Sequence, residues 1–333
     1  MSRTTPERPV DIEALFPELS RHRRTATRLH PRPGTPTAHQ SLVGGPFLWP
    51  ADEPWPVCRE RHRRSHGERP ADIRLRRRIL AEAWSRQTET GERPGPTDEE
   101  REILDGLEPG EHAPWLGETD PTPLLPVAQL FRRDVPDLKV PEGCDLLQLL
   151  WCPYDGHREL GTVGVHLRWR TASDVSGPLA EPPEPEIVGY QGYLPEPCVL
   201  HPEQVVEHEF RGLLPEDLQE RIEEWEGWDN MDLYQVALSI APGWKVGGFA
   251  SWHLTDPAPV DCFSCGRPME LLLTVDSKEW DGGSKSWCPV EDQDRAGEPD
   301  ANLPTQVVVG RGGALNVFVC PADPIHPHRL SLQ

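Results

Sequence analysis

A short phrase built from paired glycines and a spaced tryptophan occurs twice in this chain. Residues 44–56 read GGPFLWPADEPWP, and residues 247–259 read GGFASWHLTDPAP. In each copy a Trp follows the second Gly by four positions, and a Pro follows that Trp by five. Paired glycines allow a turn or bulge that other residues resist, and the Trp is expected to anchor that turn in the core. A phrase that must form the same corner twice predicts two related structural units.

Three more landmarks follow each copy in the same order. They are a Cys nine or ten residues after the Trp, an apolar segment of strand length, and a second such segment that ends in Cys-Pro. The first cysteines are Cys58 and Cys262, and the Cys-Pro pairs begin at Cys152 and Cys320. Short apolar segments bounded by Pro predict strands, and the 39 prolines of the chain disfavour long helices.

These patterns predict an α+β fold that is rich in β structure, with two pseudo-repeated antiparallel units. We expect an N-terminal helix and Pro-rich arm over residues 1–40, followed by a single domain over 41–333. Within that domain, repeat one is expected over 41–170 and repeat two over 234–333, with a connecting segment over 171–233.

Repeat one is expected to contain a helical insertion over residues 58–118. Apolar residues between 73 and 84 recur at helical spacing, which predicts a helix with one buried face. Thr97 precedes Glu100 by three positions, which is the pattern of a capping box at a second helix start.

Six segments together resemble the bacterial YwqG-like domain, a family of unknown function. They are SLVGGPFLWPADEPWP, LLPVAQLFRRDVP, CDLLQLLWCP, APGWKVGGFASW, CFSCGRPMELLLTVDS and GGALNVFVCP. The resemblance covers most of residues 40–330, and the insertion departs from it. It implies a β-rich fold of two repeats. It also implies distant kinship with eukaryotic proteins similar to programmed-cell-death protein two, which act as chaperones for a ribosomal protein, and roles of chaperone, adaptor or immunity type.

Composition narrows the environment and the partners. No run of 18 apolar residues exists, so we expect no membrane span, and the N-terminus lacks the apolar core of a secretory signal. We therefore expect a cytoplasmic protein whose 8 cysteines are thiols or metal ligands. The net charge of −21 favours a basic protein partner and repels phosphate backbones.

The motif Cys262-x-x-Cys265-Gly is typical of a zinc knuckle, in which two thiolates lie on one tight turn. Cys320 closes the strand that we place beside this turn. Three thiolates with one imidazole, or four thiolates, favour zinc among the common divalent ions, in a structural role. The candidates for the fourth ligand are His326, which we favour, His328 and Cys288. The alternative is an empty turn beside a buried Cys.

A second metal site is an open alternative in the first half of the chain. Cys58, His62 and His66 follow one another at helical spacing. By pseudo-symmetry with the second half, Cys152 and His157 complete a ligand set. A solvated helix that carries exposed His and Arg explains the same pattern without a metal.

The sequence favours a non-catalytic, zinc-stabilised binding module for a protein partner, with a groove between the repeats. Exposed Trp side chains and a rim of carboxylates are expected to contact that partner. The candidate contacts are Trp252, His253, Asp256, Trp280, Asp281 and Trp287. The alternative is an RNA-associated protein that uses the arginines between Arg59 and Arg78. A hydrolase with a pocket near His253 ranks last, because no nucleophile motif is present.

Overall fold

The structure is a computed structural model, and it describes residues 2–86, 95–157, 162–228 and 230–333. Within these residues the strands form two six-stranded antiparallel sheets and one two-stranded ladder, which confirms the predicted α+β class. Sheet A contains, in spatial order, β10 (Glu203–His208), β1 (Arg23–Arg28), β11 (Lys245–Gly247), β12 (Glu270–Asp276), β13 (Ala314–Val319) and β14 (Arg329–Leu332). Sheet B contains β2 (Arg32–Pro33), β9 (Cys198–Val199), β3 (Leu42–Val43), β6 (Leu125–Phe131), β7 (Leu146–Trp151) and β8 (Val165–Arg170). The ladder pairs β4 (Val57–Cys58) with β5 (Thr122–Pro123).

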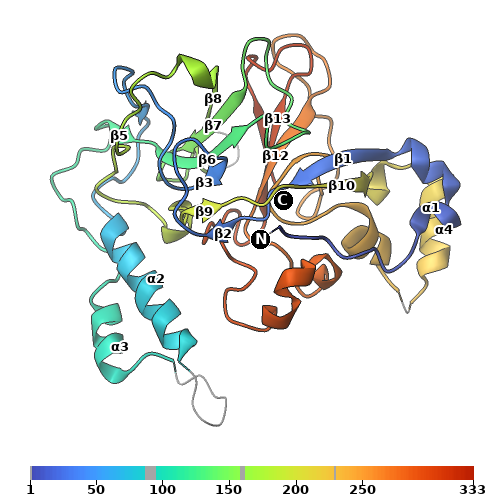
Figure 1. Cartoon of the computed structure of the whole chain (residues 1–333), viewed down its shortest axis with the longest axis horizontal. Helices are drawn as coiled ribbons and strands as arrows, with labels where there is room; N and C mark the ends of the chain where they lie inside the picture. Colours follow the sequence, from blue (N-terminus) through green and yellow to red (C-terminus); the bar gives the residue numbers. More distant parts are fainter. Residues whose placement is uncertain (1, 87–94, 158–161, 229) are drawn as a thin grey trace.

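The α-helices lie at two ends of the molecule (Figure 1). They are α1 (Ile12–Leu15), α2 (Pro70–Ser85), α3 (Asp98–Asp105) and α4 (Glu216–Glu226). The helix expected from the apolar pattern is α2, which starts on a Pro and buries Ile73, Ile79 and Ala83. The capping box at Thr97 is present at the start of α3. The insertion is therefore helical, as predicted.

The two repeats build their sheets in the same way. In sheet B the chain order β3, β6, β7, β8 is also the spatial order, and β11, β12, β13, β14 repeat it in sheet A. The second strand of each set carries an irregularity at the same place, between Pro126 and Ala128 in β6 and between Leu271 and Leu273 in β12. Each third strand is buried along its whole length, because it lies between two neighbours inside the shared core.

Each sheet also contains one strand from the other half of the chain. Strand β1 lies between β10 and β11 in sheet A, while β9 lies between β2 and β3 in sheet B. The predicted separation of residues 1–40 from the domain is therefore wrong, and repeat two begins before residue 234. The sequence RRTATR of β1 lacks the apolar alternation that marks a strand, so the sequence pattern does not indicate it.

One core cluster joins the two sheets. It includes Leu147, Leu149 and Trp151 from β7 together with Val317 from β13, all fully buried. Because a single core connects strands from both repeats, neither repeat is expected to fold without the other.

Candidate metal centres

Four potential metal ligands meet in the second repeat, and we call this set site 2. It comprises Cys262, Cys265, Cys320 and His326. The first two lie on a hairpin closed by the Asp261–Pro268 bridge, in which the N–H of Gly266 donates to the carbonyl of Cys262 at 2.8 Å. Gly266 has a φ of +68°, which lets the chain reverse where a side chain would be strained. Cys320 follows the last residue of β13.

The donor atoms of site 2 are arranged as one coordination sphere. Cys262 Sγ lies 3.4 Å from His326 Nδ1, and Cys265 Sγ lies 3.5 Å from Cys320 Sγ. All four donor atoms lie within 4.8 Å of one another. Tetrahedral zinc with Zn–S bonds of about 2.3 Å places its ligands at separations of this size. The residues therefore fit zinc, and His326 occupies the fourth position rather than His328 or Cys288. The Cys288 thiol is buried elsewhere and faces the carbonyl of Pro289.

The pKa values of Cys262 and Cys320 are lowered, whereas that of Cys265 is raised, because its interactions with Cys320 and Cys262 outweigh the backbone N–H of Arg267. Burial by itself would raise the pKa of Cys320, but backbone N–H groups and His326 lower it to about 6. The hydrogen bond with Cys320 in turn raises the pKa of His326. The Cys320 thiolate and the protonated His326 imidazolium thus stabilise each other, and a metal displaces the imidazolium proton when it binds.

A second set of four ligands lies in the first repeat, and we call it site 1. It comprises Cys58, His62, Cys152 and His157, whose donor atoms also lie within 4.8 Å of one another. His62 Nε2 lies 3.5 Å from Cys58 Sγ and 3.7 Å from Cys152 Sγ. His157 Nε2 lies 3.9 Å from Cys58 Sγ. Two thiolates and two imidazoles form a donor set that also fits zinc.

Site 1 uses His157 and not His66. Residues 59–67 form no helix, so the expected helical spacing of Cys58, His62 and His66 does not exist. His62 reaches the site from a loop, where its N–H donates to the carbonyl of Glu118 at 3.0 Å and its ring stacks on Tyr154. The spacing from Cys152 to His157 resembles that from Cys320 to His326, and this pattern is the sequence signal for His157.

Burial and a charged neighbour position the ligands of site 1. Cys58, His62 and Cys152 are buried. The hydrogen bond with Cys152, followed by that with His157, lowers the pKa of Cys58 to about 3, while the pKa of Cys152 is raised. Outside the ligand set, Glu60 lies 2.9 Å from His157 Nδ1. A carboxylate at this nitrogen fixes the tautomer and leaves Nε2 free to bind a metal.

The two sites occupy equivalent places in the two repeats. Cys58 corresponds to Cys262. Cys152 corresponds to Cys320, because Cys152 directly follows β7 and Cys320 directly follows β13, the third strands of the two sets. The β4–β5 ladder corresponds to the hairpin arms that meet at Asp261 and Pro268. Residues 59–121, which contain the insertion, thus stand where residues 263–267 form the turn of site 2. His62 from this insertion takes the place of Cys265.

The repeated phrase of the sequence positions these sites. Gly44, Gly45, Gly247 and Gly248 all have positive φ values, as expected for turns that need glycine. Trp49 packs in one cluster with the cysteines of site 1, while Trp252 packs against the cluster of Cys262 and Cys320 in site 2. Each glycine corner therefore places a Trp beside a metal-ligand set.

Three residues expected as exposed partner contacts are tryptophans, and two of them are buried. Trp280 is 4 % exposed and Trp287 is 1 % exposed, so the prediction that they are surface anchors is wrong. Trp287 packs instead under the guanidinium of Arg8, whose Cζ lies 3.6 Å from the ring centroid. Trp252 is half-buried and stacks on Phe318.

The three polar residues of that set lie in a turn or at the surface. Asp281 accepts hydrogen bonds from the backbone N–H groups of Gly283 and Ser284, which makes it a turn-forming residue. His253 and Asp256 are exposed. Across the residues that the structure describes, the ring of His253 hydrogen-bonds to neither Asp256 nor Asp281.

Most arginines of the segment 59–78 interact with other residues of the chain. Six of its nine arginines form ion pairs or hydrogen bonds within the chain. They are Arg61, Arg64, Arg69, Arg74, Arg76 and Arg77. The other three, Arg59, Arg63 and Arg78, are exposed. The segment therefore offers fewer free cations to a phosphate backbone than its composition indicates.

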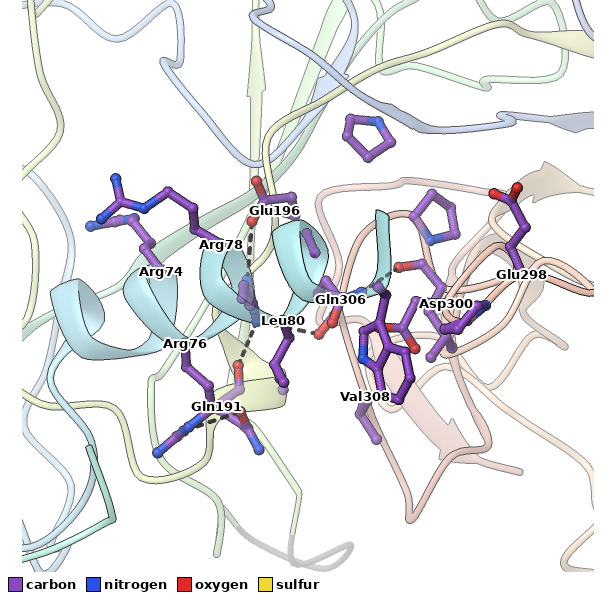
Figure 2. A pocket seen from close by; sticks show the side chains of 18 of the residues that line it. Arg74, Arg76, Arg78, Leu80, Gln191, Glu196, Glu298, Asp300, Gln306 and Val308 are labelled. Atoms are coloured by element: carbon purple, nitrogen blue, oxygen red, sulfur yellow. Dashed lines mark hydrogen bonds and ion pairs between the residues drawn. The ribbon is translucent and has the colours of Figure 1, made fainter. Parts of the chain in front are cut away.

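A groove of about 950 Å³ lies between the insertion and the second repeat. Helix α2 forms one wall, and the segment that carries Glu298, Asp300, Gln306 and Val308 lies beside it (Figure 2). Leu80 and Trp84 contribute apolar surface from α2, and Trp84 is 37 % exposed. Trp252, Trp280 and Trp287, which were expected to line a groove between the repeats, are not among the residues that line this one.

In the part of the chain that the structure describes, no helix has the length and apolar character that a membrane span requires. A comparison with protein-family models and with curated proteins finds no match to this chain.

Proposed function

We propose that the chain is a non-catalytic binding module that two zinc ions stabilise, one in each repeat. The observation that carries the proposal is the pair of four-ligand sets at equivalent positions of a duplicated fold. Each set supplies four protein donors, which is the pattern of structural zinc, whereas catalytic zinc usually keeps one position open for water or substrate. The architecture also supports membership of the YwqG-like family, which we include in the proposal.

The metals are proposed to act on the hairpins and loops that the sheets leave unsupported. Site 2 joins the Cys262 hairpin to the end of β13, and site 1 joins the insertion to the end of β7. Coordination free energy is available to the folded state when the unfolded chain lacks a preformed site. Zinc loss is therefore expected to loosen the knuckle in one repeat and the base of the insertion in the other.

The groove beside α2 is the proposed site for a protein partner. Its surface combines apolar side chains, such as Trp84 and Leu80, with charges of both signs, including Arg78 and Asp300. Such a lining suits an extended protein segment that carries an apolar anchor between charged residues. The net charge of −21 favours a basic partner through long-range attraction. A chaperone-like, adaptor or immunity-type role is compatible with this binding mode.

Metal content is the first test. Protein purified without added metal should contain about two zinc ions per chain. Cys262→Ser and Cys58→Ser should each remove one of them and lower the melting temperature. Cys144→Ser, at a half-buried thiol outside both sites, is the matched control and should retain both. Wild-type protein that contains no bound metal after anaerobic purification would refute the zinc part of the proposal.

Partner binding is tested by comparing three proteins in quantitative affinity purification. Trp84→Ala removes the exposed aromatic of the groove, and Trp115→Ala removes an aromatic that is 67 % exposed elsewhere. A genuine partner should be enriched by wild type and by Trp115→Ala and lost from Trp84→Ala. Equal enrichment by all three would place the partner outside the groove, and an RNA lost after Arg59→Ala and Arg63→Ala would favour the nucleic-acid alternative.

A further inference from the structure

The equivalent sites differ at one ligand position in a way that affects their chemistry. Site 2 has Cys265 where site 1 has His62. Cys265 is exposed at the tip of its hairpin, beside Phe263, whose side chain is 73 % exposed. His62 is 8 % exposed, and the thiols of Cys58 and Cys152 are also buried. Site 2 therefore offers a thiol to solvent, and site 1 does not.

The exposed thiol has a reaction partner within reach. Cys265 Sγ lies 3.5 Å from Cys320 Sγ, and a disulfide requires about 2.05 Å. Residues 263–267 form a solvent-exposed turn, with Gly266 next to Cys265, so the hairpin tip can shift by this small amount without repacking the core. Cys320 is held at the end of β13 and is 0 % exposed, which makes it the resolving thiol rather than the first point of attack.

Site 1 provides the internal comparison. Its two thiols are buried, as are Tyr154, which packs in one cluster with both cysteines, and Arg64, which donates to the carbonyl of Cys58. The equivalent turn in site 2 has only five residues, 263–267, and all five are exposed. Both thiols of site 1, in the repeat with the insertion, are thus buried, whereas the Cys265 thiol of site 2 is exposed.

We propose that site 2 is an oxidation site at which peroxides convert Cys265 and Cys320 into a disulfide and release the metal. This inference rests on the zinc binding proposed above. The Cys265 thiolate attacks the peroxide, the O–O bond breaks, and Cys265 becomes a sulfenic acid. The Cys320 thiolate then attacks that sulfur and expels hydroxide. Two thiolates lose two electrons in total, and with two protons from solvent one hydrogen peroxide becomes two waters.

The disulfide changes what the site can hold. Only Cys262 and His326 are left as donors, which is too few for a stable structural zinc site. The knuckle then loses its link to the end of β13 through the metal and keeps the covalent link between Cys265 and Cys320. Site 1 retains all four donors under the same conditions.

The test treats zinc-loaded protein with hydrogen peroxide and follows zinc release with a chromogenic chelator. We expect one zinc per chain to appear about tenfold faster than the other, because Cys265 is exposed whereas the other thiols of the two sites are buried. Peptide mass spectrometry after thiol blocking should locate the new disulfide at Cys265 and Cys320. Release of both ions at one rate, or a first disulfide at Cys58 and Cys152, would overturn the inference.

A ligand exchange provides the matched variant. Cys265→His gives site 2 the donor types of site 1, so it should still bind two zinc ions and lose the fast phase of release. A fast phase that persists in this variant would contradict the inference, and the disulfide mapping in wild type decides the question if the variant binds metal poorly. Zinc analysis before peroxide separates the proposals: protein without zinc refutes the proposed function, whereas bound zinc that peroxide leaves in place refutes only the oxidation site.

Discussion

Lys245 Nζ lies 2.6 Å from Glu207 Oε1, and both side chains are buried inside sheet A. The same carboxylate accepts hydrogen bonds from the backbone N–H groups of Ala241 and Phe249, each at 2.9 Å. Lys245 also donates to the carbonyl of Phe249 at 2.8 Å. This ion pair therefore holds the chain on both sides of the second glycine corner, immediately before Trp252.

Breaking this pair is expected to destabilise the whole domain. Lys245→Met removes the cation that is hydrogen-bonded to the buried Glu207 carboxylate, and breaking a buried ion pair in this way typically costs about 3–5 kcal/mol. Adding Glu207→Gln removes the negative charge that Lys245 no longer pairs with, so the double variant should be more stable than Lys245→Met alone. Denaturant unfolding at pH 7 measures all three proteins. A Lys245→Met variant with wild-type stability would show that water or another cation compensates Glu207.

Gly248 is expected to tolerate no side chain. Its φ is +69°, and a Cβ would lie 2.2 Å from Glu207 Oε2. Gly248→Ala must therefore displace the buried carboxylate, in addition to the cost of about 1 kcal/mol for a left-handed residue. Gly143→Ala is the control, because Gly143 has a φ of +79° and nothing within 4 Å of the added Cβ. Denaturant unfolding should show a clearly larger loss for Gly248→Ala, and equal losses would contradict the steric argument.

The sequence revealed those parts of the fold whose residues carry local signals. The apolar segments around Leu147 and Val317 predicted central strands because strands buried on both faces read as continuous apolar runs. The C-x-x-C spacing brought Cys262 and Cys265 onto one turn, and the recurrence of Cys-Pro located Cys320. These signals depend on neighbours within a few residues, and the structure places them as expected.

The parts that were missed depend on contacts between distant segments. The exchange of β1 and β9 between the two sheets has no local apolar signal. Strand β1, which pairs with β10, consists mainly of Arg and Thr residues. One sequence clue existed: Leu-His-Pro occurs at residues 29–31, after β1, and again at 200–202, after β9. The burial of Trp287 follows from its packing under Arg8, which lies at the other end of the chain.

Acid is expected to destabilise the protein partly through Glu279. Burial by itself would raise the pKa of this carboxyl, but His30, Arg32 and Arg28 lower it from 4.5 to about 2. A lowered folded pKa stabilises the protein above the unfolded value, and this contribution of about 3 kcal/mol disappears as the pH falls from about 4.5 towards 2. Glu279→Gln should therefore be less stable than wild type at pH 7, with a difference that shrinks below pH 4.5.

Denaturant unfolding of both proteins between pH 7 and pH 3 measures that difference. Protonation of the zinc ligands affects wild type and variant alike, so it cancels in the comparison. Glu216→Gln, at an exposed position on α4, is the control and should show no pH-dependent difference. A Glu279→Gln deficit that stays constant down to pH 3 would assign the effect to lost packing rather than to charge.

Glu60 is expected to set the zinc affinity of site 1. Its carboxylate lies 2.9 Å from His157 Nδ1, where it keeps the proton on that nitrogen and Nε2 towards the thiolates. Glu60→Ala should weaken zinc binding at site 1 by about tenfold, the lower end of the usual range for such partners, because the Glu60 side chain is half exposed. Competition with a chelator measures both sites in one protein, so site 2 is the internal reference and Arg59→Ala the neighbouring control. If the affinity ratio of the two sites is unchanged in Glu60→Ala, then His157 is oriented by its own loop and not by this carboxylate.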